Sequence, residues 1–118
     1  MGWADLLPGR RVEVLLLDPA GPRRWTRVRS GRIPRLRAKG WTVIPADRVP
    51  VFLLDAFHGP SETEWGVGVD VTADVVERLA DPGTGALYAV VLYEGAEPRA
   101  TKVTTRQRWE ELRDSLPG

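Results

Sequence analysis

The sequence predicts a single α+β domain over residues 1–118, mainly antiparallel β, with a partly open barrel or curled sheet and two short helices in the C-terminal half. Three observations support this prediction. The chain has 118 residues, of which 42% are apolar, and this suffices for one hydrophobic core but not for two. Short segments of alternating apolar residues lie between turns rich in Gly and Pro. In the second half, the apolar spacing changes twice to that of a helix.

The first half of the chain is expected to contain three strands. Residues 11–17 place Val12, Val14 and Leu16 on one face, as in a strand that is half buried. Residues 18–22 have the Asp, Pro and Gly content of a turn. The segments expected after it are a strand at 25–33, a basic loop at 34–40 and a strand at 41–44.

Residues 48–57 allow two interpretations. Val49, Val51 and Leu53 alternate as in a strand, whereas Pro50 could occupy the first turn of a helix. We favour the strand. A loop is expected at 58–61, and a strand at 65–71 on which Trp65, Val67, Val69 and Val71 share one face.

The last part of the chain alternates strands with helices. Thr72 is a predicted N-cap, Val75, Val76 and Leu79 form the apolar face of the helix that follows it, and residues 81–83 end that helix. The remaining elements are a central strand at 86–93, a hairpin to a strand at 99–103, and a helix that begins near Thr104 or Thr105 and buries Trp109, Leu112 and Leu116.

Two short motifs in residues 8–50 suggest a family. These are Pro8-Gly9-Arg10-Arg11-Val12-Glu13-Val14 and the strand Trp41-Thr42-Val43-Ile44. Together they resemble the small SH3-like β-barrels of the Tudor or KOW kind. The resemblance covers less than half of the chain, and Ala20-Gly21 only approximates the Gly-rich turn of that family. It implies a small β-barrel for this part of the chain.

The two halves of the chain carry opposite charge. Residues 1–50 contain eleven Arg or Lys against four Asp or Glu, and residues 51–118 contain six against twelve. Such segregation points to a polyanion or an acidic protein as partner, or to one half docking on the other. Residues 19–46 contain no acid at all, and their cations are Arg23, Arg24, Arg27, Arg29, Arg32, Arg35, Arg37 and Lys39.

This Arg-rich segment, with Trp25 inside it, predicts a binding site for nucleic acid, either DNA or RNA. On a strand, Trp25, Arg27 and Arg29 would share a face, so that guanidinium groups could pair with phosphates while the indole stacks on a base. Two other interpretations stay open. The segment can be a solvated basic face with Trp25 in the core, or its charge can be neutralised by the acidic half.

A second hypothesis is a module that binds or inhibits another protein, such as an accessory protein of the immunity or phage type. It would use charge and exposed Trp for recognition, and Trp3 and Trp25 are expected at the surface while Trp65 and Trp109 fill the core. The same charge asymmetry could drive head-to-tail self-association. Acidic residues for such contacts are Glu62, Glu64, Asp70, Asp74 and Glu77.

No motif predicts catalysis, so we expect a protein that is not an enzyme and uses no metal or cofactor. A small enzyme would have to centre on Asp55, His58 and Glu62, yet one short loop is poorly suited to align a Ser–His–Asp triad with Ser61. The sequence has no Cys, no apolar run long enough to cross a membrane and no signal peptide, and these features predict a cytoplasmic protein without membrane contact.

Overall fold

The structure, a computed structural model, describes residues 10–64 and 72–116. Their strands form two sheets. The first sheet has the order β2-β1-β3 and is antiparallel throughout. The second has the order β5-β4-β6-β7, in which β4 and β6 alone are parallel. The strands are β1 (Arg11–Leu17), β2 (Arg23–Arg29), β3 (Thr42–Pro45), β4 (Pro50–Asp55), β5 (Gly59–Glu64), β6 (Leu87–Glu94) and β7 (Glu97–Thr104).

These sheets confirm an α+β fold of mainly antiparallel strands. Neither sheet closes into a barrel within the described residues, so the expected SH3-like barrel is not confirmed. The two helices expected in the C-terminal half are present as α2 (Ala73–Leu79) and α3 (Arg106–Ser115). A third helix, α1 (Ile33–Ala38), lies in the basic half.

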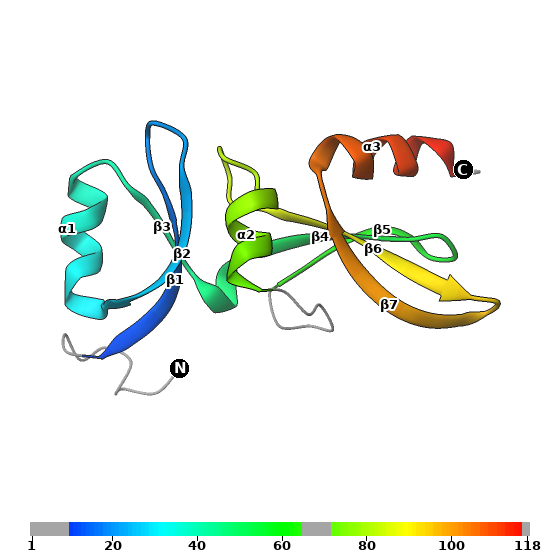
Figure 1. The fold of residues 1–118 in the computed structure, drawn as a ribbon, viewed down its shortest axis with the longest axis horizontal. Helices are drawn as coiled ribbons and strands as arrows, with labels where there is room; N and C mark the ends of the chain where they lie inside the picture. Colours follow the sequence, from blue (N-terminus) through cyan, green and yellow to red (C-terminus); the bar gives the residue numbers. More distant parts are fainter. Residues whose placement is uncertain (1–9, 65–71, 117–118) are drawn as a thin grey trace.

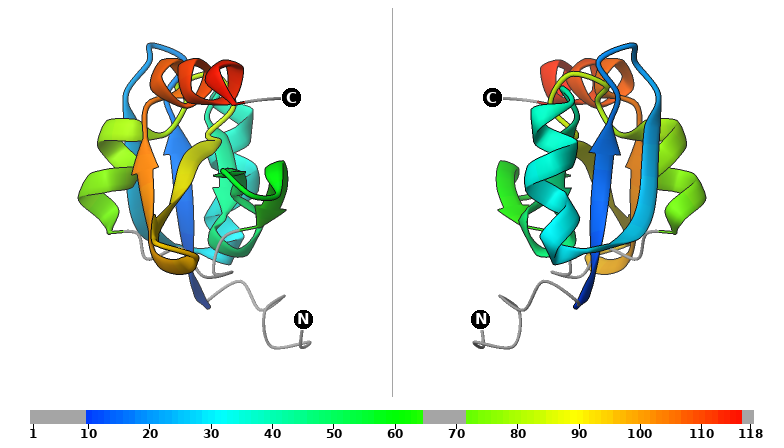
Figure 2. Two further views of the ribbon diagram at one scale, coloured as in Figure 1. Left: turned by 90° about the vertical axis from the view of Figure 1, so that its right-hand side faces the viewer. Right: turned by 90° about the vertical axis from the view of Figure 1, so that its left-hand side faces the viewer.

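The helices and sheets follow one another along an elongated molecule of 48 × 32 × 22 Å. Figure 1 shows α1 at one end, the first sheet beside it, α2 in the middle, and the second sheet with α3 at the other end. The end-on views in Figure 2 show α1 covering the outer face of the first sheet. This arrangement separates the first and second sheets along the long axis.

The two sheets share one hydrophobic core around α2. Leu15 and Leu17 of β1 meet Val76 of α2 and Leu87 of β6 in this core, and all four side chains are buried. A smaller cluster lies between the first sheet and α1, and another lies between the second sheet and α3. The strand β6 is therefore covered on both faces, as its continuous apolar sequence predicts.

The prediction of a basic loop at residues 34–40 was wrong. The strand β2 ends at Arg29, a 3₁₀ turn η2 (Ser30–Arg32) follows, and α1 begins at Ile33. Pro34 fits the first helical turn, where its missing N–H breaks no hydrogen bond. Gly40, with φ +96°, ends the helix in a Schellman motif. In this motif the Trp41 N–H donates to the Leu36 carbonyl at 3.1 Å and the Gly40 N–H donates to the Arg37 carbonyl at 3.0 Å.

Most other predicted elements are confirmed with small changes. The strand at 11–17 is β1, and residues 48–57 contain the favoured strand, β4, after the 3₁₀ turn η3 (Ala46–Arg48). The helix α2 begins after Thr72, whose side chain accepts from the Val75 N–H. Thr105, rather than Thr104, caps α3. The expected loop at 58–61 is instead largely the beginning of β5, and the predicted strand at 65–71 lies outside the described residues.

Candidate nucleic-acid interface

The charge boundary in the sequence coincides with the boundary between the two sheets. Residues 10–48, which form the first sheet with α1, η2 and η3, carry eleven Arg or Lys against three Asp or Glu. The second sheet begins at Pro50, where the acidic half of the chain also begins. Because the sheets lie at opposite ends of an elongated molecule, positive and negative charge are separated along its long axis (Figure 1).

Three cations of the Arg-rich segment are bound by the chain itself. The Arg23 guanidinium donates to the carbonyl of Ala80 at the end of α2. Arg27 lies opposite Glu13 on β1, and the two side chains form an ion pair at 3.3 Å. The Arg37 guanidinium donates to the Val43 carbonyl on β3 at 3.0 Å. Because these three side chains already have partners within the chain, they are less available to a ligand.

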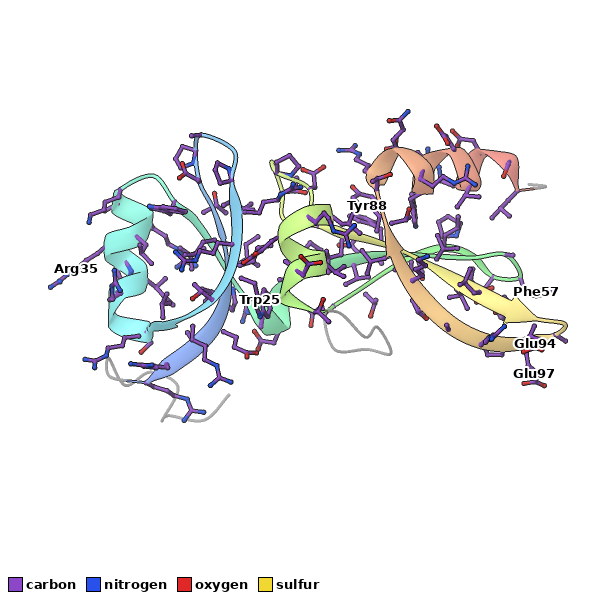
Figure 3. The ribbon with its side chains drawn as sticks, in the orientation of Figure 1. Trp25, Arg35, Phe57, Tyr88, Glu94 and Glu97 are labelled. Carbon is purple, nitrogen blue, oxygen red and sulfur yellow. The ribbon has the colours of Figure 1, made fainter. Side chains whose placement is uncertain are left out.

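The structure corrects the expected role of Trp25. Its side chain is only partly exposed and packs against the shared core, on the face of β2 that α2 covers. The Trp25 N–H donates to the Glu77 carboxylate of α2 at 3.0 Å, which satisfies a donor on the free edge of β2. Figure 3 shows Trp25 directed towards the middle of the molecule. Trp25 is therefore a partly buried residue that packs against the core, and not a fully exposed aromatic side chain.

The outer face of α1 carries three exposed cations, Arg32, Arg35 and Lys39. Arg32 is the N-cap, Arg35 lies within the helix and Lys39 is the C-cap, and their spacing of three and four residues places them along one side of it. Ile33 and Leu36 lie next to this side and pack on the first sheet. Within the described residues none of the three has an ion pair or a side-chain hydrogen bond. We call these three residues the α1 basic face, and Figure 3 shows Arg35 projecting from it into solvent.

Two further cations of the segment, Arg24 and Arg29, lie at opposite ends of β2. Both are exposed, and neither has an ion pair within the described part of the chain. Arg29 lies opposite Arg11 of β1 in the strand register and directly precedes η2, which leads to the α1 basic face. Of the nine residues predicted for the site, five cations are therefore open to an anionic ligand, and they do not form one continuous ridge on β2.

The acidic half does not neutralise these open cations. Glu77 reaches the first sheet, but it binds a backbone N–H of β2 and not a guanidinium. Several other carboxylates of the second half pair with cations of that half, such as Asp74 with Arg78 and Glu110 with Arg106. The interpretation in which one half neutralises the other is thus not realised in the residues that the structure describes.

The sequence alone could not show which cations are bound by the chain itself and which are open to an anionic ligand. The signal for the α1 basic face was present, however: Pro34 near the start and Gly40 just after the end delimit a helix. Between them, Leu36 follows Ile33 by three residues, which is the spacing of an apolar helix face.

The loop proposed for a small enzyme is a structural turn. Asp55 accepts the backbone N–H of Phe57 at 2.8 Å through one oxygen, and its other oxygen binds the Tyr93 hydroxyl at 2.7 Å and His58 Nδ1 at 3.1 Å. The His58 side chain is 79% exposed. Glu62 lies opposite Phe52 in the strand register, several residues along β5 from the turn. Asp55 and His58 are therefore brought together, but Glu62 does not join them.

The contacts of Asp55 make stability depend on pH. The Tyr93 hydroxyl bond, aided by the Phe57 N–H and by His58, lowers the pKa of Asp55 from 3.8 to about 2. Below about pH 4 the unfolded chain takes up a proton that the folded chain resists, so this contribution to stability is present above pH 3.8 and disappears as pH falls towards 2.

When the pH is lowered from about 4 to 2, we expect the free energy of unfolding to fall less in the Asp55→Asn variant than in the parent chain. The reason is that the asparagine side chain cannot take up the proton that Asp55 binds on unfolding. Urea unfolding at several pH values measures the difference. Tyr93→Phe is the matched variant, since it removes the largest cause of the lowered pKa and keeps the carboxylate; it should show an intermediate dependence. Identical acid sensitivity in all three proteins would contradict the assignment.

The described residues contain no group of three His, Asp or Glu side chains arranged to hold a metal ion. Two hollows on the described surface concern the candidate sites. One is bordered by β1, η2 and η3, and the other lies at Arg48, Pro50 and Glu62 to Glu64; neither includes Asp55 or His58. None of the helices in the described ranges has the length and apolar character needed to cross a bilayer.

Comparisons with protein-family models, with curated proteins and with solved structures found no match to this chain.

Proposed function

We propose that this chain is a non-enzymatic module that binds nucleic acid through the α1 basic face. The observation that carries the proposal is that Arg32, Arg35 and Lys39 share one exposed side of the helix and have no carboxylate partner among the residues that the structure describes. Guanidinium and ammonium groups held in this way can pair with successive phosphates of a polyanion. Arg29 lies just before the same helix and adds a fourth cation.

The position of Trp25 decides which form of nucleic acid should bind better. The Trp25 indole is partly buried against the cluster that contains α2, whereas α1 packs on the other cluster, so Trp25 offers no base-stacking partner beside the α1 basic face. Binding then depends on phosphate density, which is higher on a duplex than on a single strand. The proposal is therefore a duplex-preferring interaction with little sequence preference. The resemblance of residues 8–50 to SH3-like barrels remains part of this proposal, with the sheet β2-β1-β3 as its counterpart.

The proposal is tested by reversing the charge of the α1 basic face. We expect the triple variant Arg32→Glu, Arg35→Glu, Lys39→Glu to bind a mixed-sequence duplex at least about tenfold more weakly than the parent at low salt, because three phosphate contacts are lost. Fluorescence anisotropy with a labelled duplex measures the affinity. All three side chains are exposed, so circular dichroism should show an unchanged fold.

A matched control separates local from total charge. The variant Arg78→Glu, Arg99→Glu, Lys102→Glu changes the net charge by the same amount on exposed residues of α2 and β7. It should retain most of the duplex binding. Both triple variants should lose some affinity because their net charge is lowered by the same amount. Equal binding by the two triple variants would refute a localised interface.

A further inference from the structure

An exposed phenylalanine marks the end of the molecule opposite α1. Phe57, in the turn between β4 and β5, is 66% exposed, and Leu92 on β6 is 43% exposed. These two are the exposed large apolar side chains among the described residues. A single exposed apolar side chain is ordinary on a protein surface, so what it can bind depends on how the side chain is held and on the charges around it.

The turn holds Phe57 in one arrangement. The Phe57 N–H donates to Asp55 at 2.8 Å, and the Phe57 ring meets the Tyr93 ring edge to face, with centroids 4.7 Å apart. The Tyr93 hydroxyl is in turn bound to Asp55 at 2.7 Å. Because the ring is already ordered before binding, docking it would cost little conformational entropy.

Acidic residues accompany this aromatic side chain. Figure 3 shows Glu94 and Glu97 at the same end of the molecule as Phe57. Glu94 has a long ion pair of 3.9 Å with Arg99, and Glu97 has none within the described residues. A surface complementary to this end would combine an apolar hollow with nearby positive charge.

The basic end of the same chain offers such a hollow. Its volume is about 420 Å³, and its apolar lining comes from Val12, Ile33, Pro45 and Ala46. Arg11 is exposed at its border and has no ion pair within the described residues. Glu13 and Asp47 are the two carboxylates at the border of the hollow. Because Glu13 already pairs with Arg27, Asp47 is the remaining negative charge there. The surrounding sheet is strongly basic.

From this complementarity we infer that two copies associate head to tail, with Phe57 of one copy seated in the hollow between β1, η2 and η3 of the next. The hollow and Phe57 lie on different sheets at opposite ends of a molecule 48 Å long, so one chain cannot make this contact within itself. Glu94 and Glu97 would then face Arg11 and the first sheet. Because the two contacting surfaces differ, a docked pair still has one free Phe57 and one free hollow. Further copies can bind at both, so the association extends into open chains.

The contact is small, so the association should be weak, with a dissociation constant on the order of 100 μM, and salt should weaken it further. Sedimentation velocity on the full chain, without nucleic acid and up to about 1 mM, measures it. We expect Phe57→Ala to reduce the association at least about tenfold. Leu92→Ala is the matched control, because alternation along β6 directs Leu92 to the opposite sheet face from Tyr93; it should associate like the parent.

Mixing two variants tests the head-to-tail geometry. Ala46→Trp fills the hollow and leaves Phe57 intact, whereas Phe57→Ala leaves the hollow intact. At a protein concentration near the dissociation constant of the parent, each variant alone should be largely monomeric, and the mixture should form a dimer that grows no further. If Ala46→Trp does not fold, Arg11→Glu serves in its place. Parent chains that stay monomeric at about 1 mM, Phe57→Ala chains that associate like the parent, or variants whose mixture forms no dimer would each overturn the inference.

These experiments do not depend on the proposed function. They contain no nucleic acid, and none of the substitutions touches the α1 basic face. Loss of duplex binding on charge reversal and loss of self-association on changing Phe57 can therefore be judged separately.

Discussion

Replacing Trp109 by alanine is expected to lower the free energy of unfolding by about 3–5 kcal/mol, the range for removing a buried Trp. Only 4% of Trp109 is exposed, and it lies edge-on to Phe52 and Tyr88 with ring centroids 6.2 and 5.4 Å away. Its indole N–H donates to the Ala89 carbonyl of β6 at 3.1 Å. This one side chain thus joins α3 to β4 and β6, and its loss leaves a cavity and removes the hydrogen bond to the Ala89 carbonyl.

Urea unfolding followed by far-ultraviolet circular dichroism measures this loss. Trp109→Phe is the matched variant, because it keeps an aromatic ring in the cluster and removes the indole N–H. We expect it to lose about 1–2 kcal/mol, mostly from the lost hydrogen bond and partial packing. A loss below about 1 kcal/mol for Trp109→Ala would show that α3 does not depend on this contact.

Replacing Gly85 by alanine is expected to lower the free energy of unfolding by about 2–4 kcal/mol, through backbone strain and overpacking together. Gly85 is buried with φ +75°, a conformation that costs an L-residue about 1–2 kcal/mol. A Cβ there would lie 2.6 Å from Cδ1 of Ile44 and 3.1 Å from Cδ2 of Leu15. Leu15 is fully buried, so it has little room to move.

Gly95 provides the control for this prediction. It also has a left-handed backbone, with φ +63°, but a Cβ there would meet nothing within 4 Å. Gly95→Ala should therefore cost only the strain, about 1–2 kcal/mol. The difference between the two variants, measured by urea unfolding, isolates the close approach of Gly85 to the first sheet. Equal losses would mean that Ile44 and Leu15 move aside without cost.

The sequence predicted those elements whose signals are local. Alternation in residues 11–17 identified β1, and Thr72 with its apolar helix face identified α2. Trp109 was also placed in the core correctly, because the helical period of Trp109, Leu112 and Leu116 leaves them on one face. In each case the residues that decide the structure lie within one turn or one strand of each other.

The sequence did not predict contacts between distant segments. Trp25 was expected at the surface because its neighbours on β2 are Arg, but α2 covers that face and Glu77 binds the Trp25 N–H across 52 positions of the chain. The sequence predicted a basic loop where the helix α1 lies, because two apolar residues, Ile33 and Leu36, are too few to give a clear helical period. Both errors concern the same site, and together they move the predicted interface from β2 to α1.

The segregation of charge was visible in the sequence, but its meaning was not. From composition alone, the acidic half could equally have covered the Arg-rich segment or left it exposed. The strand order now places the two halves in different sheets, with α2 between them (Figure 1). Only the fold shows that Arg32, Arg35 and Lys39 are exposed along α1, which lies at the end of the molecule most distant from the acidic second sheet (Figure 1).

The most direct test of the proposed interface is the salt dependence of duplex binding by the parent chain. If Arg29, Arg32, Arg35 and Lys39 each contact a phosphate, a plot of log affinity against log salt should have a slope of about −3 to −4, since each contact contributes about 0.9. The α1 triple variant should have a slope close to −1 in the same plot. A parent slope near zero, or no binding to duplex at low salt, would contradict the account of an open cationic surface that receives nucleic acid.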